Sequence, residues 1–174
     1  MELPKLILTD IDGVWTDGGM FYDDQNNEFK KFNTSDSVGI LYLKLLNIPI
    51  GIITGENTEI VNRRAKKLKI EHLYLGVLDK VKVAKSLIDK LGIDFSEVAY
   101  IGDDINDIEL LKLVGFSAAP KNALNLVKEV VDINLQTNGG DGAFRDFILN
   151  ILEKCNIDEI DMYHKYLESK KLSQ

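Results

Sequence analysis

The segment Lys5-Leu6-Ile7-Leu8-Thr9-Asp10-Ile11-Asp12-Gly13-Val14 is an apolar run that ends in two aspartates, one residue apart, and a glycine. A run this apolar predicts a strand that is buried on both faces, as in parallel sheets. Asp10 and Asp12 then follow the carboxyl end of that strand, where open α/β sheets hold their ligands. Taken alone, an aspartate in this position is more often a turn residue or a helix N-cap, so the interpretation as a site depends on the rest of the chain.

The rest of the chain places further polar residues at similar points. Thr54 follows the apolar run 48–53, Lys80 comes after the run 71–75, and Gly102-Asp103-Asp104 follows the run 98–101. Thr54 and Lys80 each have an ordinary alternative, since Thr54 can cap a helix and Lys80 can be a solvated lysine at a helix start. Together these coincidences favour one shared site at the rim of a sheet.

Apolar runs alternate with segments of helical periodicity along the chain. Strands are predicted at 5–10, 48–53, 71–75, 98–101, 116–119 and 131–133. Helices are predicted from a cap at Ser35 or Asp36 to residue 46, at 57–68 and 81–91, through Leu111 and Leu113, and near 124–127. An Asp- and Asn-rich turn between two aromatic segments predicts a β-hairpin at about 19–32. The alternation predicts an α/β fold of three layers, a mostly parallel sheet with helices on both faces.

The composition fits a single domain, because 174 residues with 45% hydrophobic content can bury a core. We predict a main domain at 1–152 and a C-terminal helical tail at 153–174. A net charge of −7 argues against a nucleic-acid or an anionic membrane partner. The single Cys155, the lack of an apolar signal segment before Asp10 and the lack of a run of transmembrane length favour a cytoplasmic location.

The acids imply phosphate chemistry that uses a metal ion. Two bare carboxylates would repel a phosphate monoester unless a hard cation neutralised them, and Mg²⁺ held by Asp10, Asp103 and a backbone carbonyl suits this purpose. Asp10 is then the nucleophile that forms an aspartyl-phosphate, and Asp12 is the general acid and base. Thr54 and Lys80 donate to the phosphoryl oxygens.

These residues resemble the motifs of the haloacid dehalogenase-like phosphohydrolases. The four matching motifs are 10–14, Thr54, Lys80 and 102–107. Within that superfamily, segments 12–18, 32–36, 53–55 and 99–104 are similar to the cap-less branch of 3-deoxy-octulosonate-8-phosphate phosphatases and their nonulosonate-9-phosphate relatives. The resemblance implies a Rossmann-like sheet, a homotetramer, and Mg²⁺ held by Asp10, Asp103 and the carbonyl of Asp12.

The resemblance also implies residues that contact the substrate. Carried over by position, these are Asn33, Thr34, Ser35, Asp36, Ser37, Arg64 and Asp104. Asp103 alone is expected to bind the metal from its segment, with Asp104 and Asp107 supporting it. The ordinary alternative for these acids is a charged helix start.

The sequence departs from the octulosonate pattern at two positions where that branch commonly has arginine. Glu56 follows Thr54-Gly55, and Leu41 replaces a second arginine. Glu56 with Lys67 instead resembles the 2-keto-3-deoxynonulosonate-9-phosphate (KDN-9-phosphate) phosphatases, and an acid here suits the hydroxyls of a longer polyol. KDN-9-phosphate is therefore the favoured substrate, with 3-deoxy-octulosonate-8-phosphate as the alternative. Glu56 and Lys67 can also be a plain surface salt bridge.

Two other functional classes also fit part of the sequence pattern. One is a receiver-like module phosphorylated on aspartate, against which the intact Asp12 argues. Another is a non-catalytic oligomerisation domain, in which the motif acids would be eroded.

The predicted homotetramer is inferred from the need to close the active site. The gaps between the motifs hold no cap domain, and the hairpin carries more aromatic surface than an isolated hairpin leaves in water. We therefore predict a homotetramer in which the hairpin of one subunit walls the active site of the next, with Arg145 near that shared site. An amphipathic stripe at Ile157, Ile160, Tyr163, Tyr166 and Leu167 fits either an interface or packing on the same chain.

Overall fold

The computed structural model describes residues 1–171, and its central element is β1 (Leu6–Thr9). Together with five further strands, β1 forms one sheet in the order β5-β4-β1-β6-β7-β8, in which β4 and β6 pair with β1 and every pairing is parallel. These strands are β4 (Ile50–Ile53), β5 (His72–Tyr74), β6 (Val98–Ile101), β7 (Phe116–Ala119) and β8 (Ile133–Asn134). The predicted α/β fold with a mostly parallel sheet is confirmed, and the strand order is the part that the sequence left open.

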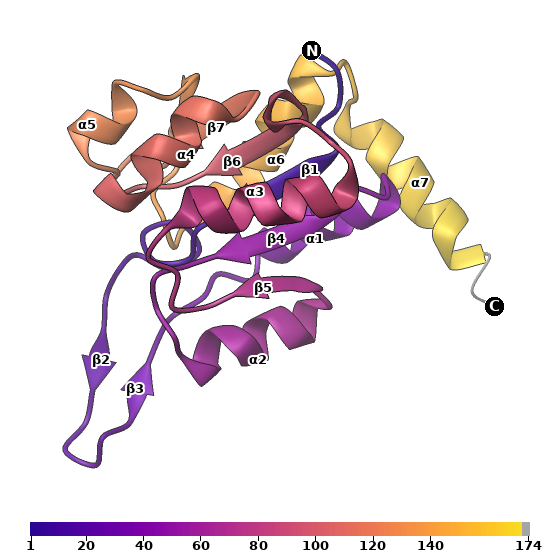
Figure 1. The fold of residues 1–174 in the computed structure, drawn as a ribbon. Helices are drawn as coiled ribbons and strands as arrows, with labels where there is room; N and C mark the ends of the chain where they lie inside the picture. The colour runs from indigo at the N-terminus through magenta and orange to yellow at the C-terminus, as the bar shows by residue number, and fades with distance from the viewer. Residues whose placement is uncertain (172–174) are drawn as a thin grey trace.

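Helices cover both faces of the sheet (Figure 1). The α-helices are α1 (Asp36–Leu45), α2 (Glu59–Leu68), α3 (Lys80–Leu91), α4 (Ile108–Leu113), α5 (Asn125–Lys128), α6 (Ala143–Lys154) and α7 (Glu159–Lys171). Two short 3-10 helices, η1 (Phe95–Glu97) and η2 (Ile105–Asp107), precede β6 and α4. No helix in the described part of the chain is long and apolar enough to cross a membrane.

Two hydrophobic clusters hold these layers together, one on each face. Ile7 of β1 belongs to the cluster that α1, α2 and α6 cover, whereas Leu6 and Leu8 belong to the cluster under α3, α4 and α5. Successive side chains of a strand point to opposite faces, so an uninterrupted apolar run serves both clusters. The buried strand predicted from the first segment therefore lies at the centre of the fold.

The hairpin consists of β2 (Phe21–Tyr22) and β3 (Glu28–Phe29), which pair antiparallel. It projects away from the body of the molecule (Figure 1). Its turn is organised by Asp23, whose carboxylate accepts hydrogen bonds from the backbone amides of Gln25 and Asn27. Among the described residues, only the hairpin and α1 stand between β1 and β4, so no cap domain is present there.

The C-terminal tail packs on its own chain through one face. Met162 of α7 is fully buried in the cluster under α1 and α6, while Ile160, Tyr163 and Leu167 are exposed. Helix α7 therefore packs on its own chain through Met162. The predicted apolar stripe of α7 stays exposed at Ile160, Tyr163 and Leu167. The last three residues of the predicted tail, 172–174, lie outside the described residues.

Candidate active site

The carboxyl ends of three neighbouring strands meet at one edge of the sheet. Asp10 follows β1, Thr54 follows β4, and Asp103 comes shortly after β6. The arrowheads of β4 and β6 point to this edge in Figure 1. The loops here form a cleft lined by Asp10, Asp12, Gly13, Asp17, Gly18, Met20, Thr54, Gly55, Glu56, Asp103, Asp104, Asn106 and Asn122. The polar residues predicted to share a rim do lie together.

Lys80 is buried beside this cleft and contacts two carboxylates. Its Nζ atom lies 3.0 Å from Asp10 Oδ2 and 2.5 Å from Asp107 Oδ1. Burial by itself would lower the pKa of Lys80, but the charges of Asp10 and Asp107 outweigh that effect and raise it. The ammonium group is therefore charged, and the alternative of a solvated lysine at a helix start is wrong.

Asp107 organises the loop after β6. Its Oδ1 accepts hydrogen bonds from Lys80 and from the hydroxyl of Tyr100, and its Oδ2 accepts from the backbone amides of Asp103 and Asp104 at 2.9 and 3.1 Å. Both oxygens of this fully buried carboxylate are thus satisfied by donors. Asp107 holds the loop that presents Asp103, in line with the supporting role expected for it, whereas the part played by Tyr100 was not foreseen.

The residues fit a cation between Asp10 and Asp103. Carboxylate oxygens of Asp10, Asp103 and Asp107 all lie within 4.8 Å of one another. Asp10 Oδ1 and Asp103 Oδ1 are buried without a hydrogen-bond partner, which is costly for a carboxylate unless a cation supplies the missing contact. Because Asp107 is occupied by donors, Asp10 and Asp103 are the pair available to the ion. Hard oxygen ligands of this kind suit Mg²⁺.

The charges of this cluster are poorly compensated by the protein alone. Burial, with the nearby carboxylate of Asp107, raises the pKa of Asp10 to about 6. Burial, with the charges of Asp10, Asp107 and Asp104, raises the pKa of Asp103 to about 8, although Lys80 opposes the shift. A divalent cation would reverse both effects by stabilising the ionised carboxylates.

Gly13 allows the two loops to come this close. Its φ is +78°, in the left-handed region that favours glycine. A Cβ atom at this position would overlap with the carboxylate of Asp103. The glycine after the two aspartates is therefore required by the approach of Asp103 as well as by the turn.

Asp12 lies one step into the loop and has a donor on each oxygen. Thr16 Oγ1 donates to Asp12 Oδ1 at 2.9 Å, and Lys30 Nζ lies 2.5 Å from Asp12 Oδ2. Lys30 comes from the hairpin, 18 positions along the chain, and is not among the residues predicted from the sequence. The signal that could have found it is its place on the inner side of an alternating segment.

Thr54 is buried at the end of β4. Its Oγ1 accepts a hydrogen bond from the backbone amide of Glu56 at 3.3 Å, which leaves its hydroxyl proton available to a ligand. The N-cap of the following helix, α2, is Thr58. The alternative in which Thr54 caps that helix is therefore wrong.

The residues predicted to contact the substrate fall into two groups. Asp104 lines the cleft and caps η2. The group at the start of α1, Asn33, Thr34, Ser35, Asp36 and Ser37, does not line the cleft in the single described chain. There Arg64 donates to the carbonyl of Asn33 and to Ser37 Oγ, and the fully buried Asp36 accepts from the amide of Arg145. Their role in binding stays a prediction.

The positions that were expected to distinguish eight-carbon from nine-carbon substrates, Glu56, Lys67 and Leu41, lie apart from one another. Glu56 lines the catalytic cleft. Lys67 lines a neighbouring groove between α2 and the hairpin, together with Arg63 and Arg64. Within residues 1–171 no ion pair joins Glu56 to Lys67, so the structure does not contain the surface salt bridge considered as the alternative. Leu41 is half-buried on α1 and lines neither space.

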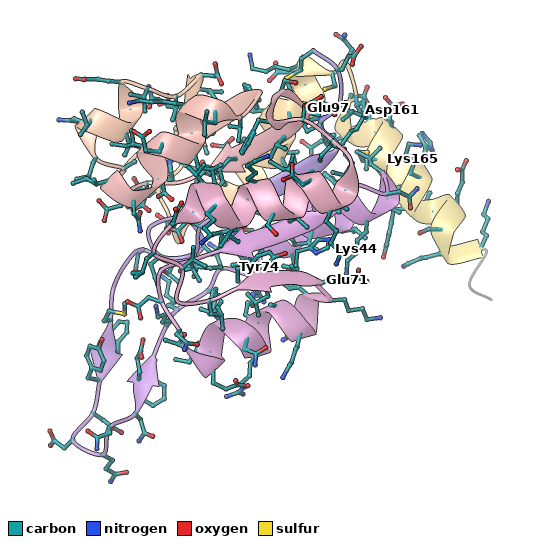
Figure 2. The ribbon with its side chains drawn as sticks, viewed as in Figure 1. Lys44, Glu71, Tyr74, Glu97, Asp161 and Lys165 are labelled. Carbon is teal, nitrogen blue, oxygen red and sulfur yellow. The ribbon has the colours of Figure 1, made fainter. Side chains whose placement is uncertain are left out.

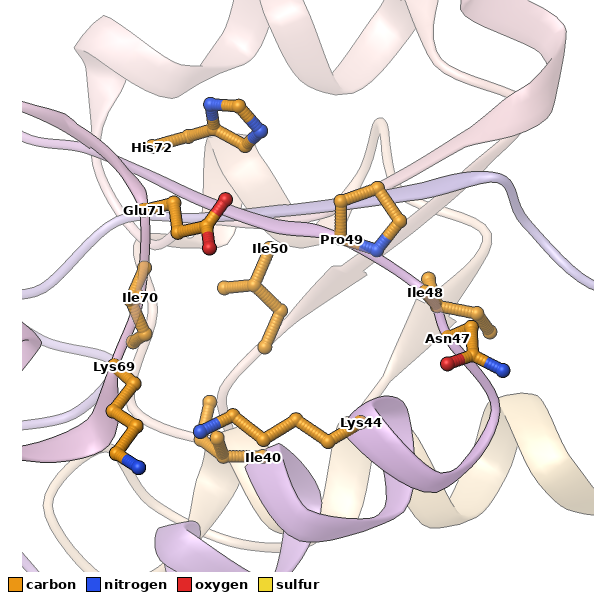
Figure 3. Close-up of a pocket in the computed structure, with 10 residues that line it drawn as sticks. All are labelled: Ile40, Lys44, Asn47, Ile48, Pro49, Ile50, Lys69, Ile70, Glu71 and His72. Carbon is orange, nitrogen blue, oxygen red and sulfur yellow. The ribbon is translucent and has the colours of Figure 1, made fainter.

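A further pocket lies at the amino ends of β4 and β5, away from the catalytic cleft. Figure 3 shows its isoleucine-rich wall, and Lys44, Glu71 and His72 also line it. Lys44 donates to the carbonyl of Leu68 at 2.6 Å. Figure 2 shows Lys44 and Glu71 on the side of the molecule away from the hairpin, and Figure 3 shows them on opposite sides of the pocket. Glu71 is the single carboxylate among its lining residues, so it lacks the paired acids of the cleft.

Comparison with known proteins relates the chain to one family. A family model described as haloacid dehalogenase-like hydrolase matches residues 57–146. The 3-deoxy-D-manno-octulosonate 8-phosphate phosphatase of Haemophilus influenzae is 36% identical over 174 residues, covering 98% of this chain and 96% of that protein. The enzyme of the same name from Salmonella typhi is 36% identical over 156 residues, covering 89% and 83%.

Solved structures show the same relation. The 3-deoxy-D-manno-octulosonate 8-phosphate phosphatase of Moraxella catarrhalis, described in complex with magnesium ion, phosphate ion and KDO, has a TM-score of 0.84 and 37% identity, covering 86% of each chain. A putative haloacid dehalogenase superfamily (subfamily III A) hydrolase from Legionella pneumophila has a TM-score of 0.89 and 35% identity, covering 95% of this chain and 90% of the other.

Proposed function

This chain belongs to the 3-deoxy-D-manno-octulosonate 8-phosphate phosphatase family of haloacid dehalogenase-like hydrolases, and we propose that it removes the phosphate of 3-deoxy-D-manno-octulosonate 8-phosphate. Membership makes it a phosphoric monoester hydrolase. The observation that carries the proposal is the convergence of Asp10, Asp12, Thr54, Lys80 and Asp103 on one cleft, in a chain that matches a phosphatase of this family over almost its whole length.

The proposed reaction has two chemical steps. In the first, an oxygen of Asp10 forms a bond to phosphorus while the bond to the sugar oxygen breaks, and Asp12 gives its proton to that oxygen. In the second, a water oxygen forms a bond to phosphorus while Asp12 takes a proton from that water. The bond between phosphorus and the Asp10 oxygen breaks, which frees inorganic phosphate and restores the Asp10 carboxylate. Thr54 and Lys80 donate to the phosphoryl oxygens, where negative charge collects.

The cofactor is Mg²⁺, which Asp10, Asp103 and the carbonyl of Asp12 would hold. Two orphaned carboxylate oxygens, on Asp10 and Asp103, support this assignment, as does the magnesium ion in the Moraxella catarrhalis complex. The cation supplies positive charge that lets the phosphate approach the acidic cleft.

The eight-carbon substrate replaces our first preference for KDN-9-phosphate. The enzymes of Haemophilus influenzae, Salmonella typhi and Moraxella catarrhalis quoted above are named for the eight-carbon acid, which supports the alternative substrate expected from the sequence. KDN-9-phosphate stays a second candidate because Glu56, the acid that favoured it, does line the cleft. The intact motif acids speak against a non-catalytic oligomerisation domain.

The proposal extends to assembly and location. A homotetramer is supported by the aromatic side chains that the hairpin exposes, namely Phe21, Tyr22 and Phe29. The free Cys155 is compatible with a reducing compartment, and we keep the cytoplasm as the proposed location.

Phosphate release from the two sugar acids tests the proposed substrate. We expect Mg²⁺-dependent hydrolysis, with kcat/KM at least about tenfold higher for the eight-carbon ester, because a site shaped for one polyol loses contacts with another. Asp10→Asn should abolish turnover of both esters, since it keeps the side-chain volume and removes the attacking charge. A higher kcat/KM for the nine-carbon ester would return the assignment to KDN-9-phosphate. Hydrolysis by folded Asp10→Asn would contradict the mechanism.

A further inference from the structure

The returning arm of the hairpin has an inner and an outer side. Phe29 and Lys31 are exposed, whereas the side chain of Lys30 has no exposed surface and Phe32 packs against the core. This is the period of two that an extended chain imposes on its side chains. Lys30 and Phe32 therefore attach the arm to the body, while its outer side stays open.

Lys30 contacts a wall residue of the catalytic cleft of its own chain, Asp12. Its Nζ atom lies 2.5 Å from Asp12 Oδ2, and the next carboxylate, Glu28, is 3.9 Å away. Thr16 holds the other oxygen of Asp12 at 2.9 Å. With one donor on each oxygen, the Asp12 carboxyl group cannot turn without breaking a contact.

The two buried lysines beside the cleft have separate tasks. Lys80 pairs with Asp10 and Asp107, and Lys30 pairs with Asp12. An ammonium group is costly to bury without a carboxylate, so the burial of Lys30 depends on Asp12. The nucleophile and the acid/base thus each have their own cation, and the one for the acid/base is carried by the hairpin.

We propose that Lys30 is a positioning residue for Asp12, through which the hairpin holds the proton donor beside the leaving oxygen of the substrate. The inference rests on the proposed function of Asp12. In the step concerned, the bond between phosphorus and the leaving oxygen breaks and the proton of Asp12 moves to that oxygen, and Lys30 makes neither bond. A donor that is displaced by about 1 Å loses much of its effect on the rate.

Two phosphate esters of similar size can show whether Lys30 acts on proton delivery to the leaving group or on another part of the reaction. 4-Nitrophenyl phosphate releases a weakly basic phenolate that needs little protonation, whereas benzyl phosphate releases an alkoxide that needs a full proton. The ratio kcat/KM includes departure of the leaving group and excludes the later hydrolysis of the phosphoenzyme. We expect Lys30→Met to lower kcat/KM about 10- to 100-fold for benzyl phosphate and less than about threefold for 4-nitrophenyl phosphate.

Three further variants serve as controls. Lys31→Met removes the same charge from the neighbouring exposed position and should leave both values within about twofold. Lys30→Arg, which retains the positive charge, should recover part of the loss. Asp12→Asn with Lys30→Met should lose no more than Asp12→Asn alone, because Lys30 acts only through Asp12.

Equal losses on both esters, or additive losses in the double variant, would overturn the proposal and make Lys30 a structural support of the hairpin. If Asp12→Asn itself does not distinguish the two esters, the acid/base role of Asp12 fails and the proposal falls with it. Neither ester contains a sugar, so these outcomes are independent of which sugar acid is the natural substrate.

Discussion

At Gly13 the loop after β1 lies against the Asp103 carboxylate of the loop after β6. The left-handed backbone of Gly13 and the adjacent Asp103 carboxylate leave no room for a Cβ atom. We expect Gly13→Ala to cost about 1 kcal/mol in backbone strain and to displace Asp103, lowering kcat/KM about 100-fold. Thermal unfolding with and without Mg²⁺ should show that the variant has lost most of the stabilisation by the ion.

Gly92 offers a matched control for this prediction. It also has a positive φ, +67°, at the end of α3, but no heavy atom lies within 4 Å of a Cβ built there. Gly92→Ala should therefore show similar strain and keep the response to Mg²⁺ and the activity. A Gly13→Ala variant that Mg²⁺ stabilises as strongly as the unmodified protein would contradict the account of Asp103.

Among the secondary-structure elements, helix α1 begins with a buried carboxylate, that of Asp36. Asp36 is fully buried, Arg145 donates a backbone hydrogen bond to its Oδ1, and its Oδ2 has no hydrogen-bond partner. Burial raises the pKa of Asp36 from 3.8 to about 6, although Arg64 and Arg145 oppose the shift. A carboxyl whose pKa is higher in the folded state contributes stability at low pH and loses it as the pH rises through about 6.

Asp36→Asn should remove this pH dependence. Between pH 5 and pH 7.5, the free energy of unfolding of the unmodified protein should fall relative to that of the variant by about 1.4 kcal/mol. Denaturant unfolding at the two pH values, at one fixed Mg²⁺ concentration, measures the difference. Asp89→Asn, on the exposed side of α3, is the charge-matched control and should show no such trend. If the free energy of unfolding of the unmodified protein relative to Asp36→Asn is the same at both pH values, Asp36 does not change its protonation state between them, which contradicts a pKa near 6.

At the scale of the whole molecule, the hairpin leaves apolar surface without cover from its own chain. Phe21 is 58% exposed, Tyr22 71% and Phe29 57%. Phe21 and Phe29 face each other in the register of the hairpin. This exposed apolar side supports the proposed homotetramer, in which a neighbour covers it.

Replacing both phenylalanines with serine should weaken that assembly. We expect Phe21→Ser/Phe29→Ser to shift light scattering toward smaller species and to lower activity toward the sugar phosphate at low protein concentration. Leu126→Ser, which removes an exposed leucine from α5, should change neither. A monomeric unmodified protein with full activity would contradict shared active sites.

The sequence by itself determined the α/β class, the position of most elements and the polar side chains at the strand ends that meet at the cleft, among them Asp10, Thr54 and Asp103. These follow from local properties: the period of apolar residues, the glycine at the end of α3, and acids placed directly after buried strands. Some local predictions were approximate at element ends. The helix expected from residue 57 begins at Glu59, and a 3-10 turn held by Asp107 precedes α4.

Only the tertiary structure decided the strand order and the partners of the buried charges. Lys30 meets Asp12 across 18 positions, and Lys80 meets Asp107 across 27. Alternation along the hairpin can mark Lys30 as inward-facing, but no local pattern names the partner of either lysine, because that partner lies on a distant segment of the chain. The same holds for Asp36, whose sequence position marks a helix start, while its pKa depends on burial against α6. Desolvation depends on how distant segments pack together, so it cannot be predicted from a local stretch of sequence.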